Sequence, residues 1–242
     1  MNQFTDFPID EKNQVKVIIA GAGGSGKTTL VERIIYDNRD KFKNIICFCP
    51  SKRFGTDDYN CLGPFVDSDV SMENIMAKIA AQERLALMYR KKKLREPPYC
   101  LIILDDILDS ALKLKGKDQA YFVGKIATCR HMFTSLVIVI QTLHNTIPPA
   151  IRDQTDIIYF YRCGFDGKLV KQMIPPIEPP EGYKGKVMSA KQFEEYISSL
   201  VREPNVCVMY NNKTKTYNQK FKVTPAPKFV LERYIEEDED SE

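Results

Sequence analysis

Short apolar runs rich in β-branched residues recur between residues 15 and 161, and amphipathic segments separate them. Runs that are apolar at almost every position are typical of strands buried on both faces of a sheet. Strands are therefore predicted over 15–20, 44–49, 99–104, 136–140 and 157–161. Apolar residues recur at helical spacing between these runs, so helices are predicted over 27–38, 71–94 and 118–129. The stretch over 51–64, rich in Gly, Asp, Asn and Ser, is predicted as loop. This alternation predicts an α/β fold with a mostly parallel sheet flanked by helices.

The pattern changes after residue 173. Four prolines between 175 and 180 are typical of a stiff linker. A helix over 190–201 and a hairpin of 206–210 and 216–223 are predicted beyond it. This helix and hairpin form either a small appendage or an extension of the sheet edge. The predicted organisation is an arm over 1–14, a core over 15–175, a C-terminal extension over 176–235 and an acidic disordered tail over 236–242.

A glycine-rich turn joins the first predicted strand to the first predicted helix. It fits the phosphate-loop pattern G-x-x-x-x-G-K-[ST]. Its glycines let successive N–H groups point at phosphate oxygens, and the helix N-terminus adds partial positive charge. Lys27 is expected to span the β- and γ-phosphates, and the Thr28 hydroxyl to bind Mg²⁺. The predicted nucleotide-binding residues are Gly21, Ala22, Gly23, Gly24, Ser25, Gly26, Lys27, Thr28 and Thr29.

Two adjacent acids, Asp105 and Asp106, follow the buried run that ends at residue 104. The C-terminal ends of strands are where open α/β sheets bind ligands. Asp105 is predicted to hold Mg²⁺, which prefers hard oxygen ligands, and Asp106 to polarise the attacking water as a general base. A water-activating second acid favours hydrolysis, and no guanine-selecting Asn-Lys-x-Asp sequence occurs. ATP is therefore the predicted substrate.

Three polar residues flank the strand predicted over 136–140. Gln141 follows it directly, and its amide could reach the γ-phosphate or the attacking water without neutralising the acids. Arg130 and Arg152 lie on either side, and each is a candidate finger that enters a neighbouring subunit's site. The alternatives are a simple strand cap for Gln141 and a solvated surface position for each arginine.

Composition adds few constraints. The net charge of +3 is too small to indicate an acidic partner by itself. Seven cysteines without metal-ligand spacing, together with an N-terminus unlike a secretory signal, predict an intracellular protein in a reducing compartment. No apolar run approaches the roughly 20 residues of a membrane helix, so no membrane span is predicted.

The order of these motifs resembles a known family. GAGGSGKTT, NIICFCP, CLIILDD, CRHMFTSLVIVIQT and IPPAIRDQTDIIYFY follow one another as in the A32-like DNA-packaging ATPases of nucleocytoplasmic large DNA viruses and virophages. These belong to the FtsK–HerA superfamily of P-loop ATPases, with a RecA-like (ASCE) sheet. The resemblance implies a motor that uses ATP to drive double-stranded DNA into a preformed capsid. It assigns water activation to Asp106, sensing to Gln141 and the finger to Arg130.

The resemblance also implies partners. It indicates a homo-oligomeric ring, a pentamer or hexamer, with capsid or portal proteins as partners and with the host cytoplasm, viral factory or virion as location. A ring motor needs a basic lining that grips phosphates without reading sequence. The candidates are 90–95 and the lysines at 113, 115 and 117, and solvated surface is the alternative for each. Two other functions stay open: a P-loop kinase of a small molecule and a non-hydrolysing nucleotide-dependent scaffold or loader.

Overall fold

The computed structural model describes residues 2–3, 14–107, 117–141, 151, 153–162, 189–214 and 216–231. Arg152, Lys113, Lys115 and the acidic tail, all named in the predictions above, lie outside these residues. Among the residues described, no helix is long and apolar enough to cross a membrane.

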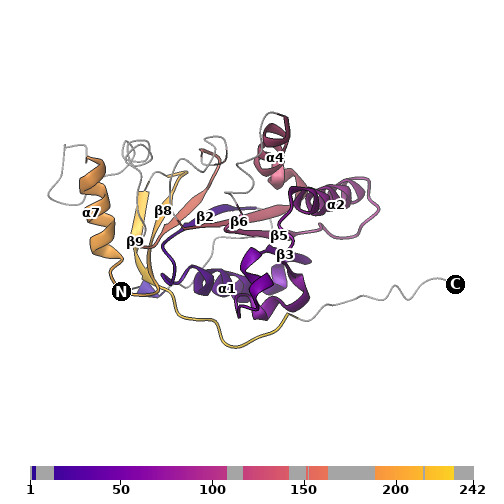
Figure 1. The fold of residues 1–242 in the computed structure, drawn as a ribbon. Helices are drawn as coiled ribbons and strands as arrows, with labels where there is room; N and C mark the ends of the chain where they lie inside the picture. The colour runs from indigo at the N-terminus through magenta and orange to yellow at the C-terminus, as the bar shows by residue number, and fades with distance from the viewer. Residues whose placement is uncertain are drawn as a thin grey trace.

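Five parallel strands form the centre of one mixed sheet (Figure 1). Their order across the sheet is β7 (Ile157–Phe160), β2 (Lys16–Ala20), β6 (Thr134–Ile140), β5 (Cys100–Asp105) and β3 (Asn44–Phe48). Each of the five strands predicted over 15–161 is thereby confirmed. The two-residue strand β4 (Val66–Asp67) pairs with β3 at that edge.

The C-terminal hairpin extends the same sheet. Strand β8 (Val206–Asn211) pairs antiparallel with β7, and β9 (Thr216–Lys222) pairs antiparallel with β8. The outer edge is completed by β1 (Asn2–Gln3), which pairs parallel with β9. Of the two alternatives left open by the sequence, the structure therefore has the sheet extension.

Helices cover both faces of the sheet because its strand residues alternate between two hydrophobic cores. Ile18 and Ala20 of β2 belong to the core under α2 (Met72–Arg90), α4 (Lys117–Thr128) and α7 (Ala190–Leu200). Val17 and Ile19 belong to the core on the other face, under α1 (Lys27–Asn38). Figure 1 shows α2 and α4 on one side of the sheet and α1 on the other. The predicted helices are confirmed, although α2 ends at Arg90 rather than near 94.

The stretch after β3, expected as loop, is built from short helical turns. These are η2 (Pro50–Phe54) and η3 (Asn60–Phe65). They pack over α1's side of the sheet, where Tyr59 and Leu62 are fully buried. The chain beyond β9 returns across this region: the Leu231 amide donates to the Cys61 carbonyl at 2.8 Å, and Phe229 stacks edge-on against Tyr36.

Candidate functional site

The glycine-rich turn between β2 and α1 forms a tight curl. Lys27 Nζ donates to the carbonyl oxygens of Gly21 at 2.7 Å and Ala22 at 3.0 Å, so its side chain folds back over the turn. Gly24 and Gly26 have φ of 69° and 103°, which side chains rarely allow. A Cβ on Gly21 would lie 2.6 Å from the Tyr161 Cβ. The glycines are therefore required by the conformation and the packing of the turn.

Asp105, the acid at the end of β5, is held in place by hydrogen bonds from Tyr59 and Cys49. Asp105 Oδ2 accepts a hydrogen bond from the Tyr59 hydroxyl at 3.0 Å and a weaker one from the Cys49 thiol at 3.7 Å. Burial raises the pKa of Asp105 to about 6; the Tyr59 hydrogen bond and the Lys27 charge oppose this rise, and the Asp106 charge adds to it. Ionised Asp105 thus lies in a poorly solvated position, where a nearby cation would stabilise it.

The next acid points outward. Asp106 is exposed and has a left-handed φ of 54°. Its Oδ2 accepts a short hydrogen bond from Nε2 of Gln141. The amide of Gln141 therefore fixes the orientation of this carboxylate without changing its charge. An exposed, oriented carboxylate has the geometry that a general base for water requires.

Strand β6 joins the glycine-rich turn to the two acids. The Gly21 amide donates to the Ile140 carbonyl, and the Asp106 amide donates to the Val139 carbonyl, both at 3.1 Å. Since β6 lies between β2 and β5, its tip carries Gln141 between the turn and the acids. The structure thus brings Gly21, Lys27, Asp105, Asp106 and Gln141 together at the carboxyl edge of the sheet.

The residues at this edge fit Mg²⁺. Thr28 lies in the first turn of α1 and Asp105 at the end of β5, so a hydroxyl and a carboxylate are the available ligands. Within the described ranges, no cluster of three or more histidine, cysteine or acidic side chains could form an all-protein metal cage. Mg²⁺ in phosphate-handling sites is characteristically held by one or two protein oxygens together with phosphate oxygens and water.

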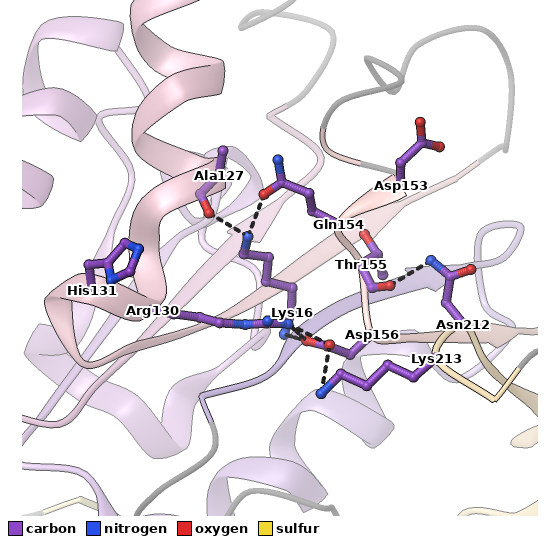
Figure 2. Close-up of a pocket in the computed structure, with 10 residues that line it drawn as sticks. All are labelled: Lys16, Ala127, Arg130, His131, Asp153, Gln154, Thr155, Asp156, Asn212 and Lys213. Carbon is purple, nitrogen blue, oxygen red and sulfur yellow. Dashed lines mark hydrogen bonds and ion pairs between the residues drawn. The ribbon is translucent and has the colours of Figure 1, made fainter.

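Arg130 lies at the amino ends of the parallel strands, opposite to the carboxyl ends that carry the glycine-rich turn and the two acids. It belongs to η4 (Cys129–Met132), just before β6. Its Nη2 donates to both carboxylate oxygens of Asp156, a residue that is 6% exposed and precedes β7. Figure 2 shows Arg130 and Lys213 meeting at Asp156, with Lys213 Nζ 3.2 Å from Oδ1. The Lys16 amide also donates to Asp156, at 2.8 Å.

These residues line a cavity of about 480 Å³. Lys16 Nζ donates there to the Ala127 carbonyl at 2.7 Å and to Gln154 Oε1 at 2.9 Å (Figure 2). Burial lowers the pKa of Lys16. Burial alone would raise the pKa of Asp156, but hydrogen bonds from Arg130, the Lys16 amide and Lys213 hold it below its usual value. The cavity is thus a charged pocket built around one buried carboxylate.

Arg130 is therefore separated from its own subunit's glycine-rich turn. The seven residues of β6 rise about 3.3 Å each, so the two edges of the sheet lie roughly 20 Å apart. Arg130 cannot contact a phosphate bound by the same chain in this arrangement.

The basic end of α2 lies at the same end of the strands as Arg130, because Arg90 Nη2 donates to the His131 carbonyl at 2.6 Å. Lysines 91–93 and Arg95 are exposed there, and Lys117 is exposed at the start of α4.

Sequence reasoning missed Tyr59 as a site residue. It stands in a stretch predicted as loop, and only the fold brings it to Asp105, 46 residues away. A tyrosine flanked by Asp58 and Asn60 in a polar, glycine-containing stretch gives no periodic signal. Its complete burial and its left-handed φ of 56° mark it clearly in the structure.

Comparison with known proteins gives one family and several solved structures of the same fold. The model of the family described as Poxvirus A32 protein matches residues 3–176. The chain is similar in structure to the DNA-packaging ATPase B204 from Sulfolobus turreted icosahedral virus, with TM-score 0.58, 15% identity, and 88% of this chain and 99% of that chain covered. A search of curated proteins gives no match.

Two further solved structures share the fold. The genome-packaging NTPase B204 from Sulfolobus turreted icosahedral virus 2, in complex with AMPPCP, has TM-score 0.54 and 13% identity, with 89% of this chain and 100% of that chain covered. The cytoplasmic domain of the Thermomonospora curvata type VII secretion ATPase EccC has TM-score 0.56 and 14% identity, with 90% of this chain and 26% of that chain covered. At these identities the likeness shows the fold, a P-loop ATPase sheet, as predicted.

Proposed function

This chain belongs to the Poxvirus A32 protein family, and from that premise we propose that it is an ATP-hydrolysing motor that moves double-stranded viral DNA into a preformed capsid. The observation that carries the hydrolytic part is the Gln141–Asp106 hydrogen bond beside the glycine-rich turn. This hydrogen bond orients the exposed Asp106 carboxylate toward the position that a water attacking the terminal phosphate of ATP would take. A kinase would need an acceptor at that position instead of water.

ATP binding starts from the curled turn. The phosphates take the place of the Gly21 and Ala22 carbonyls as partners of Lys27 Nζ, which then spans the β- and γ-phosphates. Backbone N–H groups between Gly23 and Thr29 line the phosphate path, whereas those of Gly21 and Ala22 donate to the Ile140 and Arg162 carbonyls and hold the turn on the sheet. The N-terminus of α1 adds partial positive charge. The glycines and the chain packed behind them hold this cradle in shape before nucleotide arrives.

Hydrolysis uses the residues at the tips of β5 and β6. Thr28 and Asp105 would hold Mg²⁺, which when bound neutralises charge on the phosphate oxygens. Tyr59 keeps Asp105 in place through its hydroxyl. Asp106 accepts a proton from water as the water oxygen bonds to the γ-phosphorus; the bond from that phosphorus to the β–γ bridging oxygen breaks, and ADP leaves. Gln141 keeps the Asp106 carboxylate aimed at the water.

The distance of Arg130 from the glycine-rich turn of its own chain supports completion of the site by a neighbouring subunit. In a head-to-tail ring, the edge that carries Arg130 in one subunit faces the nucleotide edge of the next. Arg130, or Arg152 as the other candidate, would then stabilise charge that develops on the transferred phosphoryl group. For Arg130 this requires release from Asp156, which keeps Lys213 and the Lys16 amide as partners. A pentamer or hexamer provides such interfaces.

The DNA partner is gripped through its phosphates. The exposed lysines at the end of α2 and those at 113, 115 and 117 are the basic residues assigned to this contact, which reads no sequence. Capsid or portal proteins would dock the ring at the particle. This activity places the chain in the infected cell's cytoplasm, in a viral factory or on the virion.

Steady-state ATP hydrolysis with and without double-stranded DNA, and with no other phosphate acceptor, tests the proposal. DNA is expected to raise the rate, and replacing the lysines at 91, 92 and 93 by alanine is expected to reduce that stimulation and the salt dependence of DNA binding. Hydrolysis that needs an added small-molecule acceptor, or that is indifferent to DNA, would sink the motor assignment.

A further inference from the structure

The end of the glycine-rich turn is braced by the C-terminal extension. Asn205, between α7 and β8, donates its backbone N–H to the Ser25 carbonyl at 3.3 Å. Its own carbonyl accepts from the Val223 amide at 2.8 Å, just past the end of β9. The connector is therefore tied to the hairpin on one side and to the turn on the other.

Gly26 packs directly against Asn205. A Cβ built on Gly26 would lie 2.2 Å from Asn205 Oδ1 and 3.0 Å from Asn205 Cα, so that side of the turn is filled. Asn205 itself has a left-handed φ of 58°, a conformation that asparagine and glycine accept more readily than other residues. The backbone of the connector is thus shaped to meet the turn at this point.

The hydrogen bond to Ser25 sets the direction of the next amide. The peptide unit is planar and trans, so its C=O and N–H point in opposite directions. With the Ser25 carbonyl anchored on Asn205, the Gly26 N–H points away from Asn205. A flipped unit would instead turn a carbonyl oxygen toward the phosphates, where two negative groups would repel each other.

We propose that Asn205 is a positioning residue for nucleotide binding, and that its left-handed backbone fixes the Ser25–Gly26 peptide so that the Gly26 N–H faces the phosphates of ATP. This inference rests on the proposed function only in that the turn binds ATP. It gives the C-terminal hairpin a role at the active site: through Asn205 it completes the phosphate cradle from the side opposite to β6.

Substitutions at Asn205 separate backbone shape from side-chain chemistry. Asn205→Gly keeps the N–H and the left-handed φ, so its Kd for a fluorescent ATP analogue should stay within about threefold of the wild type. Asn205→Val disfavours that φ and displaces the N–H, so its Kd should rise roughly tenfold, the size expected when one hydrogen bond to a charged group is lost. Asn205→Ala should fall between them.

Titration of each variant with the ATP analogue distinguishes a folding defect from a misaligned Ser25–Gly26 peptide. A variant that is partly unfolded binds less analogue at saturation without a change in Kd, whereas a misaligned peptide raises Kd at full stoichiometry. A Kd that rises from Asn205→Gly to Asn205→Ala to Asn205→Val supports the proposal. This holds even if the valine variant folds poorly, because the Kd values of the glycine and alanine variants already differ. Equal Kd values for glycine and alanine variants, or a glycine variant as weak as the valine variant, would overturn it. No binding by the wild-type chain would overturn the proposed function as well.

Discussion

Tyr59 and Asp106, both next to the end of β5, adopt left-handed backbone conformations with φ of 56° and 54°. Non-glycine residues with positive φ are uncommon, and such conformations persist only where surrounding contacts enforce them. The conformation of Tyr59 is enforced by complete burial and by the hydrogen bond that its hydroxyl donates to Asp105. That of Asp106 is enforced by the hydrogen bond from its amide to the Val139 carbonyl and by the one that its carboxylate accepts from Gln141. The left-handed backbone of Asp106 thus goes with a carboxylate that is exposed, next to the less exposed carboxylate of Asp105.

Removal of a single hydroxyl tests the support of Asp105. Tyr59→Phe deletes the hydrogen bond that favours ionised Asp105, so half-maximal ATP hydrolysis should need roughly tenfold more Mg²⁺, the effect expected for one hydrogen bond to a charged acceptor. The maximal rate at saturating Mg²⁺ should change little. Rate against Mg²⁺ concentration is the measurement.

The control is Tyr159→Phe, the same deletion from another fully buried tyrosine, in β7. It should leave the Mg²⁺ dependence as in the wild type. An equal shift in both variants would mean that the effect comes from general loosening of the core, and the assignment of Tyr59 would fail.

At the scale of elements, the buried carboxylate of Asp156 joins three segments. It accepts from the amide of Lys16 in β2, from Arg130 in η4 and from Lys213 after β8. Lys16 and Asp156 are 140 residues apart, and Lys213 belongs to the C-terminal extension, so this junction ties the start of the central strand to that extension. It is a reason for the hairpin to fold as part of the sheet.

Asp156→Asn should lower the free energy of unfolding by about 1–3 kcal/mol at pH 7, since hydrogen bonds to a charged group are lost and Arg130 is partly solvated. The pKa of Asp156 is lower in the folded chain than its usual value. Its contribution is therefore present above the unfolded pKa of about 3.9 and disappears as pH falls through the folded value. Urea denaturation at several pH values should show the two proteins converging in acid.

A matched control is Glu96→Gln, which breaks the exposed ion pair with Lys43. Exposed pairs contribute little, so stability should not change measurably at pH 7. If the Asp156 variant were as stable as this control, or if its deficit persisted unchanged in acid, the junction would not have the role described.

Local signals in the sequence predicted the elements and the glycine-rich turn, but not the contacts between distant segments. The strand over 16–20 and the helix over 27–38 follow from periodicity and from Gly26-Lys27-Thr28, which are close in the chain. Tyr59 and Asn205 act through contacts with residues far along the chain, 46 positions away in the case of Tyr59. Their types are common in loops, so pattern alone assigns them no role. The position of Arg130 at the far edge also required the fold.

At the scale of the whole molecule, the glycine-rich turn and Arg130 lie at opposite ends of the parallel strands, so in the proposed ring each chain would supply one half of two different sites. Arg130→Ala and Asp106→Asn should each bind ATP and hydrolyse it poorly, because each lacks one half. Mixed in equal amounts, they should regain part of the rate, since roughly a quarter of head-to-tail interfaces then hold both groups. ATPase rate against mixing ratio is the measurement, and a mixture no faster than its components would count against Arg130 as the trans residue.

The central claim, that ATP hydrolysis moves this chain along double-stranded DNA, is tested most directly by displacement of a third-strand oligonucleotide from a duplex. With ATP, the assembled protein should release the third strand after a lag that lengthens with the distance from the duplex end. Asp106→Asn, which is expected to bind ATP and DNA, should release none. A wild-type protein that hydrolyses ATP faster with DNA yet releases no third strand would contradict the account, because its hydrolysis would then not be coupled to movement.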